Sequence, residues 1–448
     1  MFKTKTLPLV LCALSLTACS KVTGVFDSKK EERILEGERI SVLQLQKSLV
    51  ADTPLKEGER FALPKAWENK AWPQAGGYPN HSMQNLALQT QSGELKKIWS
   101  ANIGRGSTRE LPLTAQPIVA DGRAFTLDTK SKLSAINIEN GKRIWSISVK
   151  SDDEDDPVIG GGIAYAHKML FVTNGYDEII SVSPETGDIM WRKTLPSPSR
   201  AAPTILSGRV YISTVDSRLV ALDAKDGSSI WEYTGIGETA GLLGAASPGA
   251  NKDIVVPVFS SGEITALRVE NGSVAWSDNL SNVRRFGGGL ESMSDITAMP
   301  VLDQGLVIAM SFGGKLVAID ERTGTRIWQR EISGSKTPWI TGNTLFVLSS
   351  ENQLICMNIL DGAIFWITEL PRFEDEEDKE DPIHWTAPVL ANGRLVLASS
   401  HGYLTEVNPH TGDVLSQIRT KKNVQVSPII AGNTLYLLSN DGTLIAYR

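Results

Sequence analysis

Histidine and cysteine side chains bind metals or act as nucleophiles, and this sequence holds few of them. Its histidines show none of the paired spacings that metal sites use, so surface or turn positions are expected for His81, His167, His384, His401 and His410. The glycine runs at residues 160–162 and 287–289 lack the lysine and the following helix of a phosphate-binding loop, and they favour loops at the starts of strands. We therefore expect no metal and no cofactor.

The N-terminus predicts an exported chain. Residues 1–18 read as a signal peptide, because two lysines precede an apolar stretch, residues 7–16, that is too short to span a bilayer. Residues 16–19, Leu-Thr-Ala-Cys, resemble the bacterial lipobox, in which the chain is cut before a cysteine that carries the lipid. Cys19 is the expected lipidation site, and a plain signal peptide cut nearby is the alternative. Ser20 follows this cysteine, at the position where an inner-membrane retention signal would usually place an aspartate. The resemblance therefore implies a lipoprotein of the outer membrane that faces the periplasm.

Cysteine usage and charge narrow the function further. Removal of the signal and acylation of Cys19 would leave only Cys356, so the exported chain can form no internal disulfide. The formal charge is −6, with 51 acidic against 45 basic side chains and no basic run, which disfavours nucleic acid or anionic lipid as the main ligand. A hydrophobic content of 41% and 11 tryptophans predict a large packed core.

A repeated pattern, A-x-D-x-x-T-G-x-x-x-W, organises most of the chain. It is clearest at residues 318–328, AIDERTGTRIW, and it recurs every 38 to 52 residues, which is the period of a four-stranded propeller blade. Other copies lie at residues 135–145, 181–191, 221–231, 266–276 and 356–366, and a copy without tryptophan lies at residues 406–416. Alternating segments joined by Asn-Gly, Asp-Gly or Thr-Gly turns surround each copy, as half-buried strands and hairpins require.

The chain ends before its last blade is complete. Residues 427–448 stop where the outer strand should follow, whereas residues 92–99, SGELKKIW, offer an outer strand ahead of the first blade. An N-terminal strand that completes the C-terminal blade would close the ring and remove two free sheet edges. The predicted fold is therefore all-β, an eight-bladed β-propeller of four-stranded blades.

The repeat also predicts how neighbouring blades pack. The glycine makes the turn into the outer strand, and the tryptophan on that strand can span the gap to the next blade. The small residue ten positions before it leaves room for the indole, and Cys356 occupies that position as a buried small side chain. The expected inter-blade residues are Trp99, Trp145, Trp191, Trp231, Trp276, Trp328 and Trp366.

The repeat, with WPQAGGYPN at residues 72–80, resembles the quinoprotein-like eight-bladed propellers over residues 70–448. Together with the lipobox it resembles the BamB family, lipoproteins of the outer-membrane β-barrel assembly machinery. The resemblance implies a scaffold without catalysis that docks on the POTRA modules of BamA, among other assembly subunits, and that could contact nascent outer-membrane proteins. A periplasmic propeller lipoprotein with another envelope partner is the alternative. A quinone-dependent dehydrogenase is a poorer one, because no two cysteines are adjacent and no carboxylates match its calcium site.

Long crossing segments between blades should gather on one face, where binding is usual. The family resemblance assigns BamA contacts to a loop arginine before a proline and to an S-D-x-[DT] stretch, which match Arg200 and Asp295, with Thr297 at the position of a second aspartate. An ordinary surface charge pair is the alternative for the first two. The acidic runs at residues 152–156 and 374–381 are expected to be solvated loops, with repulsion or steering of a charged partner as the alternative.

The expected domains are a signal peptide at residues 1–18, a lipidated cysteine and tether at residues 19–68, and the propeller at residues 69–448. The tether is polar and charged and should be mostly flexible. Residues 39–45 could add an edge strand.

Overall fold

The computed structural model describes residues 49–151, 158–237, 246–281 and 295–448. The chain divides into two compact units, Met1–Leu49 and Val50–Arg448, and the second holds all the strands described here. Cys19, the possible edge strand at residues 39–45 and the acidic run at residues 152–156 lie outside the described residues. Within the described ranges no helix is present, so none could cross a membrane.

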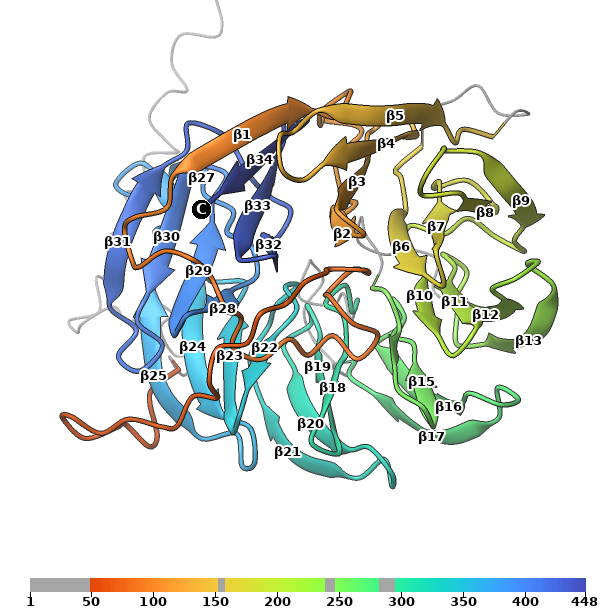
Figure 1. The fold of residues 1–448 in the computed structure, drawn as a ribbon. Coiled ribbons are helices and arrows are strands. Elements are labelled where there is room, and N and C mark those ends of the chain that lie inside the picture. The colour runs from red at the N-terminus through yellow and green to blue at the C-terminus, as the bar shows by residue number, and fades with distance from the viewer. Residues whose placement is uncertain (1–48, 152–157, 238–245, 282–294) are drawn as a thin grey trace, which may run out of the picture. The chain divides into compact units, whose positions relative to one another are not determined.

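The unit Val50–Arg448 is a ring of eight four-stranded antiparallel sheets, which confirms the predicted propeller (Figure 1). From the innermost strand outward, blade 1 is β2 (Ile118–Ala120), β3 (Arg123–Leu127), β4 (Lys132–Asn137) and β5 (Arg143–Ser148), and blade 2 is β6 (Gly162–Ala166), β7 (Met169–Thr173), β8 (Glu178–Val182) and β9 (Ile189–Thr194). Blade 3 is β10 (Thr204–Leu206), β11 (Arg209–Ser213), β12 (Arg218–Asp223) and β13 (Ser229–Thr234), and blade 4 is β14 (Gly249–Ala250), β15 (Ile254–Val256), β16 (Glu263–Arg268) and β17 (Val274–Asn279).

The remaining blades follow the same order. Blade 5 is β18 (Val301–Asp303), β19 (Leu306–Met310), β20 (Leu316–Asp320) and β21 (Arg326–Arg330), and blade 6 is β22 (Trp339–Thr341), β23 (Thr344–Leu348), β24 (Gln353–Asn358) and β25 (Ile364–Glu369). Blade 7 is β28 (Val389–Ala391), β29 (Arg394–Ala398), β30 (Tyr403–Val407) and β31 (Val414–Arg419). Blade 8 combines β32 (Ile429–Ala431), β33 (Thr434–Ser439) and β34 (Thr443–Tyr447) with the N-terminal β1 (Lys97–Asn102).

The ring closes as the sequence predicted, because β1 pairs antiparallel with β34, with Trp99 opposite Ala446. Both strands would otherwise present free edges. A short extra hairpin, β26 (Phe373–Asp375) with β27 (Glu380–Pro382), lies in the crossing from blade 6 to blade 7.

The repeat encodes one local turn. In blade 5, Asp320 Oδ1 accepts the Thr323 amide at 2.7 Å, and the Gly324 amide donates to the Asp320 carbonyl at 2.9 Å. Gly324 has a φ of 74°, a conformation that glycine adopts without the strain imposed by a side chain. The pairing register then shifts by a bulge after Ala318, which lies opposite Trp328.

Each tryptophan of the repeat lies against the turn glycine of the next blade. Trp328 contacts Gly362, where an added Cβ atom would lie 2.8 Å from the indole ring, and Trp328 Nε1 donates to the Ile359 carbonyl at 2.7 Å. The same glycine contact recurs for all seven tryptophans, and six of them donate to a carbonyl of the next blade at 2.7–3.1 Å. Trp191 is the exception, since its Nε1 is buried without a hydrogen-bond partner in the described structure.

The contact between blades 7 and 8 is polar instead. Ser416 replaces the tryptophan and lies against Gly93, while Glu406 occupies the small-residue position opposite it. Glu406 is fully buried, forms an ion pair of 2.6 Å with buried Arg394, and accepts bonds from Ser416, from Ser92 and from the Gly93 amide. We call Ser92, Gly93, Arg394, Glu406 and Ser416 the polar seam; it joins blade 7 to the segment that leads into β1.

Cys356 lies opposite Trp366, is fully buried, and has a thiol pKa raised by burial. The prediction of a buried small side chain is confirmed.

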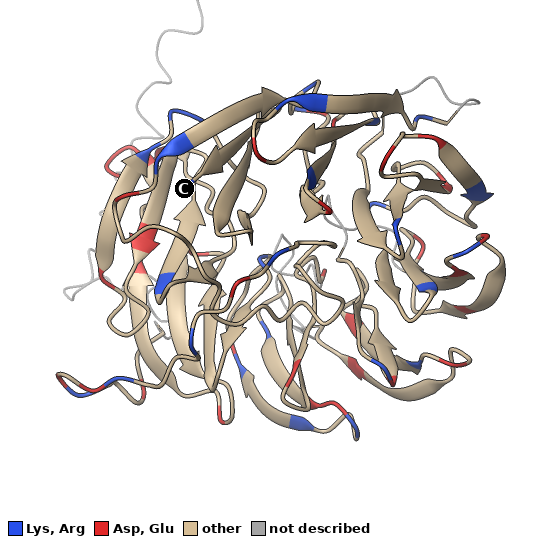
Figure 2. Ribbon diagram, viewed as in Figure 1, with Lys and Arg blue, Asp and Glu red and all other residues tan. Residues whose placement is uncertain are grey.

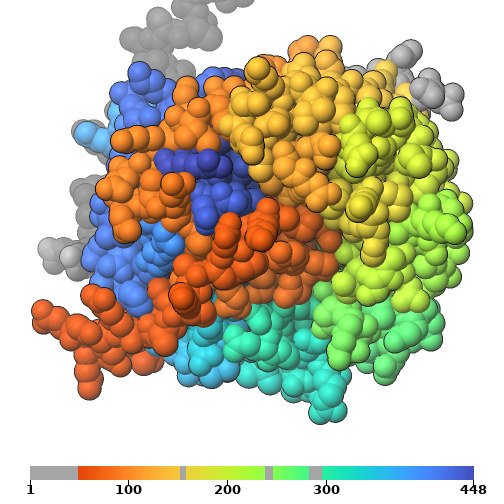
Figure 3. Space-filling model, in the orientation of Figure 1, coloured from red at the N-terminus to blue at the C-terminus, as the bar shows by residue number. Residues whose placement is uncertain are grey.

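Residues 69–88, which we call the plug, cross one end of the ring (Figures 1 and 3). Each of the eight blades donates one backbone amide from its inner strand, or from the residue after it, to the plug at 2.7–2.9 Å. In chain order the acceptors are Asn69, Trp72, Pro73, Gln74, Pro79, Asn80, Gln84 and Leu86, and they serve blades 8, 1, 2, 3, 4, 5, 6 and 7 in that order. The plug therefore satisfies inner-edge amides that a bare ring would leave unpaired.

Residues 50–68, assigned to the tether from sequence, contact the propeller. Asp52 pairs with Arg330 at 2.6 Å, and Phe61 stacks on Phe365 with ring centroids 5.9 Å apart. The compact unit thus begins at Val50, ahead of the boundary expected at residue 69.

Candidate functional site

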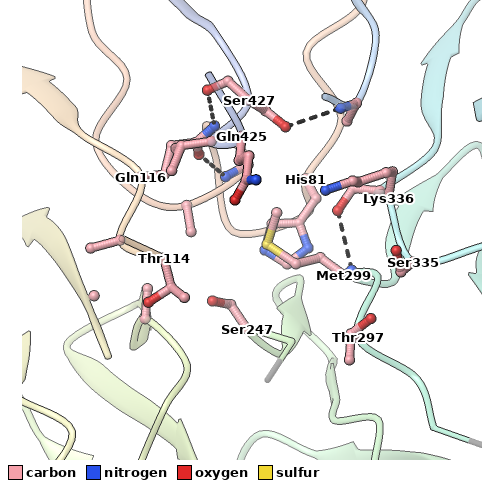
Figure 4. A pocket seen from close by; sticks show the side chains of 18 of the residues that line it. His81, Thr114, Gln116, Ser247, Thr297, Met299, Ser335, Lys336, Gln425 and Ser427 are labelled. Atoms are coloured by element: carbon pink, nitrogen blue, oxygen red, sulfur yellow. Dashed lines mark hydrogen bonds between the residues drawn. The ribbon is translucent and has the colours of Figure 1, made fainter. Parts of the chain in front are cut away.

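A cavity of about 660 Å³ occupies the axis of the ring (Figure 4). Its walls are the residues that lead into the inner strand of every blade, from Thr114 before β2 to Ser427 before β32. Because crossing segments enter the inner strands here, the walls belong to the crossing face, opposite the turns that join first to second strands. The volume is that of a small-molecule site.

The plug forms the floor of this cavity. Gln116 holds it to blade 1, since its Oε1 accepts Trp72 Nε1 at 3.2 Å and the Gly76 amide at 2.9 Å. An added Cβ atom at Gly76 would lie 2.8 Å from the His81 ring, so the turn needs glycine for space as well as for its φ of 71°.

His81 is a neutral floor residue. It is 4% exposed, and burial lowers its pKa to about 4. Its Nδ1 lies 2.7 Å from the Pro300 carbonyl, which can only accept, so Nδ1 carries the proton. His81 is therefore buried and not at the surface. Its φ of 58° and the bond from its amide to the Tyr78 carbonyl at 2.9 Å place it at a turn, the other position expected from sequence.

Two cationic side chains lie in the walls of the cavity. Arg200 and Lys336 line it, together with hydroxyl and amide side chains and the apolar Met299, Phe312 and Trp339, and no Asp or Glu lines it within the part of the chain that the structure describes. Lys336 is partly buried, its side chain points into the cavity, and burial lowers its pKa (Figure 4). Elsewhere, acidic and basic positions are interspersed around the blades (Figure 2).

The structure brings together two of the three residues assigned to partner binding. Arg200, in the crossing from blade 2 to blade 3, and Thr297, ahead of blade 5, line the same cavity and are partly exposed. Asp295 does not line it and is 5% exposed. A partner would therefore reach Asp295 only after a local rearrangement.

The second acidic run, residues 374–381, spans the β26–β27 hairpin and is exposed. Glu374 in this hairpin contacts His401 of blade 7. Over the described ranges, no group of three or more His, Cys, Asp or Glu side chains is placed to hold a metal ion.

Eight four-stranded blades, seven of which carry the tryptophan of the repeat on the outer strand, define a quinoprotein-like β-propeller. The fold matches that of a quinohemoprotein alcohol dehydrogenase from Comamonas testosteroni, with a TM-score of 0.69 and 13% identity, over 85% of this chain and 81% of that one. It also matches the crystal structure of BamB from Moraxella catarrhalis, with a TM-score of 0.67 and 20% identity, over 79% of this chain and 99% of that one.

Comparison of the sequence is more specific than comparison of the fold. The family model described as outer membrane protein assembly factor BamB matches residues 82–168, 152–368 and 372–448. The chain belongs to this family. A curated relative, outer membrane protein assembly factor BamB of Yersinia pestis, is 24% identical over 359 residues, which cover 78% of this chain and 88% of the relative.

Sequence reasoning missed Lys336 and the plug. The sequence does contain a signal for Lys336. A proline precedes most of the inner strands, and the residues just before this proline line the cavity, as in Lys336-Thr337-Pro338 and Gln116-Pro117. The plug has no such signal, because its sequence has neither a period nor a turn motif.

Proposed function

We propose that this chain is a non-enzymatic scaffold of the outer-membrane β-barrel assembly machinery, anchored through lipidated Cys19 at the periplasmic face of the outer membrane. It docks on the POTRA modules of BamA and assists the insertion of outer-membrane proteins. The observation that carries the proposal is the family match, which extends across all eight blades.

The crossing face is the docking surface in this proposal. Arg200 and Thr297 are partly exposed at the cavity on this face, while the opposite end of the ring is covered by the plug. A guanidinium at such a position can pair with a carboxylate of a partner in bidentate geometry.

A quinone-dependent dehydrogenase is disfavoured by the chemistry of the cavity. Calcium in such a site needs carboxylate and amide oxygens, whereas the charged side chains that line this cavity are Arg200 and Lys336. The cavity therefore suits binding rather than calcium-assisted redox chemistry.

Affinity capture tests the docking role. The tagged full chain is expressed in its own envelope, extracted in mild detergent, captured, and the eluate is analysed by mass spectrometry. We expect BamA to be enriched with the wild-type chain and to fall at least about tenfold with Arg200→Glu, since charge reversal at a contact costs several kcal/mol.

Arg322→Glu is the matched control, because Arg322 is exposed in the turn between β20 and β21 on the opposite face. Equal recovery of BamA with both variants would remove Arg200 from the docking surface. A folded, lipidated chain that recovers no BamA would refute the docking role and favour another envelope partner.

A further inference from the structure

The axial cavity differs in charge from the rest of the molecule. Acidic residues outnumber basic ones by 51 to 45 in the chain, yet the described residues that line this cavity include Arg200, Lys336 and no carboxylate. His81 on the floor is neutral near pH 7 because its pKa is about 4. The charge of the described lining is therefore positive in an acidic protein.

Lys336 is held there without a partner. Within the described part of the chain its Nζ makes no hydrogen bond or ion pair, and burial is what lowers its pKa. The hydroxyl of the next residue is engaged elsewhere, because Thr337 Oγ1 accepts the Met299 amide at 3.2 Å. A partly buried ammonium without a counter-charge is costly, and a bound anion would offset that cost.

The cavity is covered by the plug at one end and is partly apolar. Trp339, Phe312 and Met299 lie in its walls on the side of Lys336, at blades 5 and 6. Trp339 is itself fixed, because its Nε1 donates to the plug carbonyl of Gln84 at 2.9 Å. A pocket of about 660 Å³ with apolar side chains beside Lys336 fits an organic anion with an apolar body better than a bare inorganic ion.

We propose that the axial cavity is a binding site for a small organic anion, a carboxylate, sulfonate or phosphate ester with an apolar body, whose charged group pairs with Lys336. Arg200, on the wall of blade 3, adds to the field that attracts the anion. The site does not depend on the docking role, and Lys336 is the residue through which it is tested.

The test uses a matched pair of fluorescent probes, 8-anilinonaphthalene-1-sulfonate and N-phenyl-1-naphthylamine, which differ by the sulfonate. Titration of the soluble chain from Val50 onward follows the rise in probe fluorescence, with energy transfer from tryptophan to the bound probe. We expect saturable sulfonate binding that weakens by about tenfold or more in Lys336→Met, since a charge-assisted hydrogen bond is lost, and that is largely restored in Lys336→Arg. N-phenyl-1-naphthylamine should bind both proteins equally.

Lys225→Met is the charge-matched control, because Lys225 is an exposed turn residue between β12 and β13. It should leave sulfonate binding unchanged. Phenyl phosphate, a phosphate ester with an apolar body, should displace the sulfonate from the wild type, and inorganic phosphate should do so only at higher concentration.

Three results would overturn the proposal: no saturable sulfonate binding, equal sulfonate affinity of wild type and Lys336→Met, or an equal loss for the neutral probe, which would make Lys336 a spacer in an apolar pocket. A measurement without mutation gives a second check. Acetylation of Lys336 by an activated ester, quantified by mass spectrometry, should slow at least about threefold when phenyl phosphate fills the site, whereas Lys225 should react at the same rate. Equal rates at Lys336 with and without phenyl phosphate would contradict the proposed pairing.

Discussion

Lys336 destabilises the fold in which it lies, and its substitution should show this. Its pKa is lowered by burial, so between that folded value and the unfolded value of about 10.4 the folded chain binds fewer protons than the unfolded chain. The destabilisation is fully present below the folded pKa and is relieved as pH rises through this window. Among the described residues that line the cavity, Arg200 and neutral His81 are the other titratable groups, and neither offers a negative charge.

We expect Lys336→Met to raise Tm at pH 7 by about 1–2 °C, which corresponds to about 1 kcal/mol for a unit of this size. Differential scanning fluorimetry at pH 7 and pH 9.5 measures it, and the advantage over the wild type should shrink at the higher pH. Lys225→Met should change little at either pH. A Tm for Lys336→Met below that of the wild type would show that the ammonium is stabilised by the protein.

The tryptophans make a second test at the residue scale. Trp328 is 8% exposed, contacts Gly362 and donates to the Ile359 carbonyl, so Trp328→Ala should cost about 3–5 kcal/mol. Trp328→Phe keeps an aromatic ring but leaves that carbonyl without its donor, at a cost of about 1–3 kcal/mol. Trp191→Phe removes a donor that has no partner in the described structure, and it should be close to neutral.

Urea unfolding followed by circular dichroism compares the three variants. The difference between the two phenylalanine variants isolates the hydrogen bond to the next blade from ring packing. Equal midpoints for them would show that the indole hydrogen bond adds nothing to the contact between blades 5 and 6.

At the scale of elements, the polar seam replaces the tryptophan contact where β1 and β31 meet. Burial of Glu406 raises its pKa, but hydrogen bonds from Ser416, Ser92 and Gly93 and the charge of Arg394 outweigh burial, so the net pKa is lowered. Glu406 therefore contributes stability above its unfolded pKa of about 4.3, and this contribution is lost as pH falls through the lower folded value.

Glu406→Gln should destabilise the chain by about 3–5 kcal/mol at pH 7, because it leaves Arg394 buried without its charge partner. The double variant Arg394→Met with Glu406→Met should recover most of that loss. The double variant should also lose less Tm than the wild type as pH falls from 7 to 3, because it has no Glu406 carboxylate to protonate. A single variant as stable as the wild type would show that the pair contributes no net stability.

The blades could be predicted from sequence and the plug could not, for a physical reason. Residues 318–328 encode a turn, a bulge and a cross-strand pair within eleven positions, so the pattern is visible in the sequence. The plug is held by bonds such as Asn69 Nδ2 to the Ile430 carbonyl, 361 residues apart, which no local period reveals. Arg200 is a candidate for partner binding only through the family resemblance. That Lys336 points into the axial cavity can be known only from the closed ring, because other blades form the rest of the cavity wall.

At the scale of the whole propeller, the plug connects blades that otherwise contact only their neighbours. Each blade gives it one inner-edge amide, from Val119, Tyr165, Ile205, Ala250, Leu302, Gly342, Asn392 or Gly432. Inner strands of two to five residues are too short to be stable edges alone, and buried amides without acceptors cost about 1–3 kcal/mol each. The plug should therefore determine whether the ring unfolds as a unit.

A chain that starts at residue 89 removes the plug but keeps β1 and all eight blades, and a chain that starts at residue 69 is its matched control. We expect the shorter chain to lose at least about 10 °C of Tm, because several buried inner-edge amides lose their acceptors at once. Hydrogen exchange with mass spectrometry should then show lost protection in the eight inner strands while the outer strands stay protected. If protection falls evenly across all four strands of each blade, the plug is an ordinary part of the core; if it does not fall, the inner edges are stable without it.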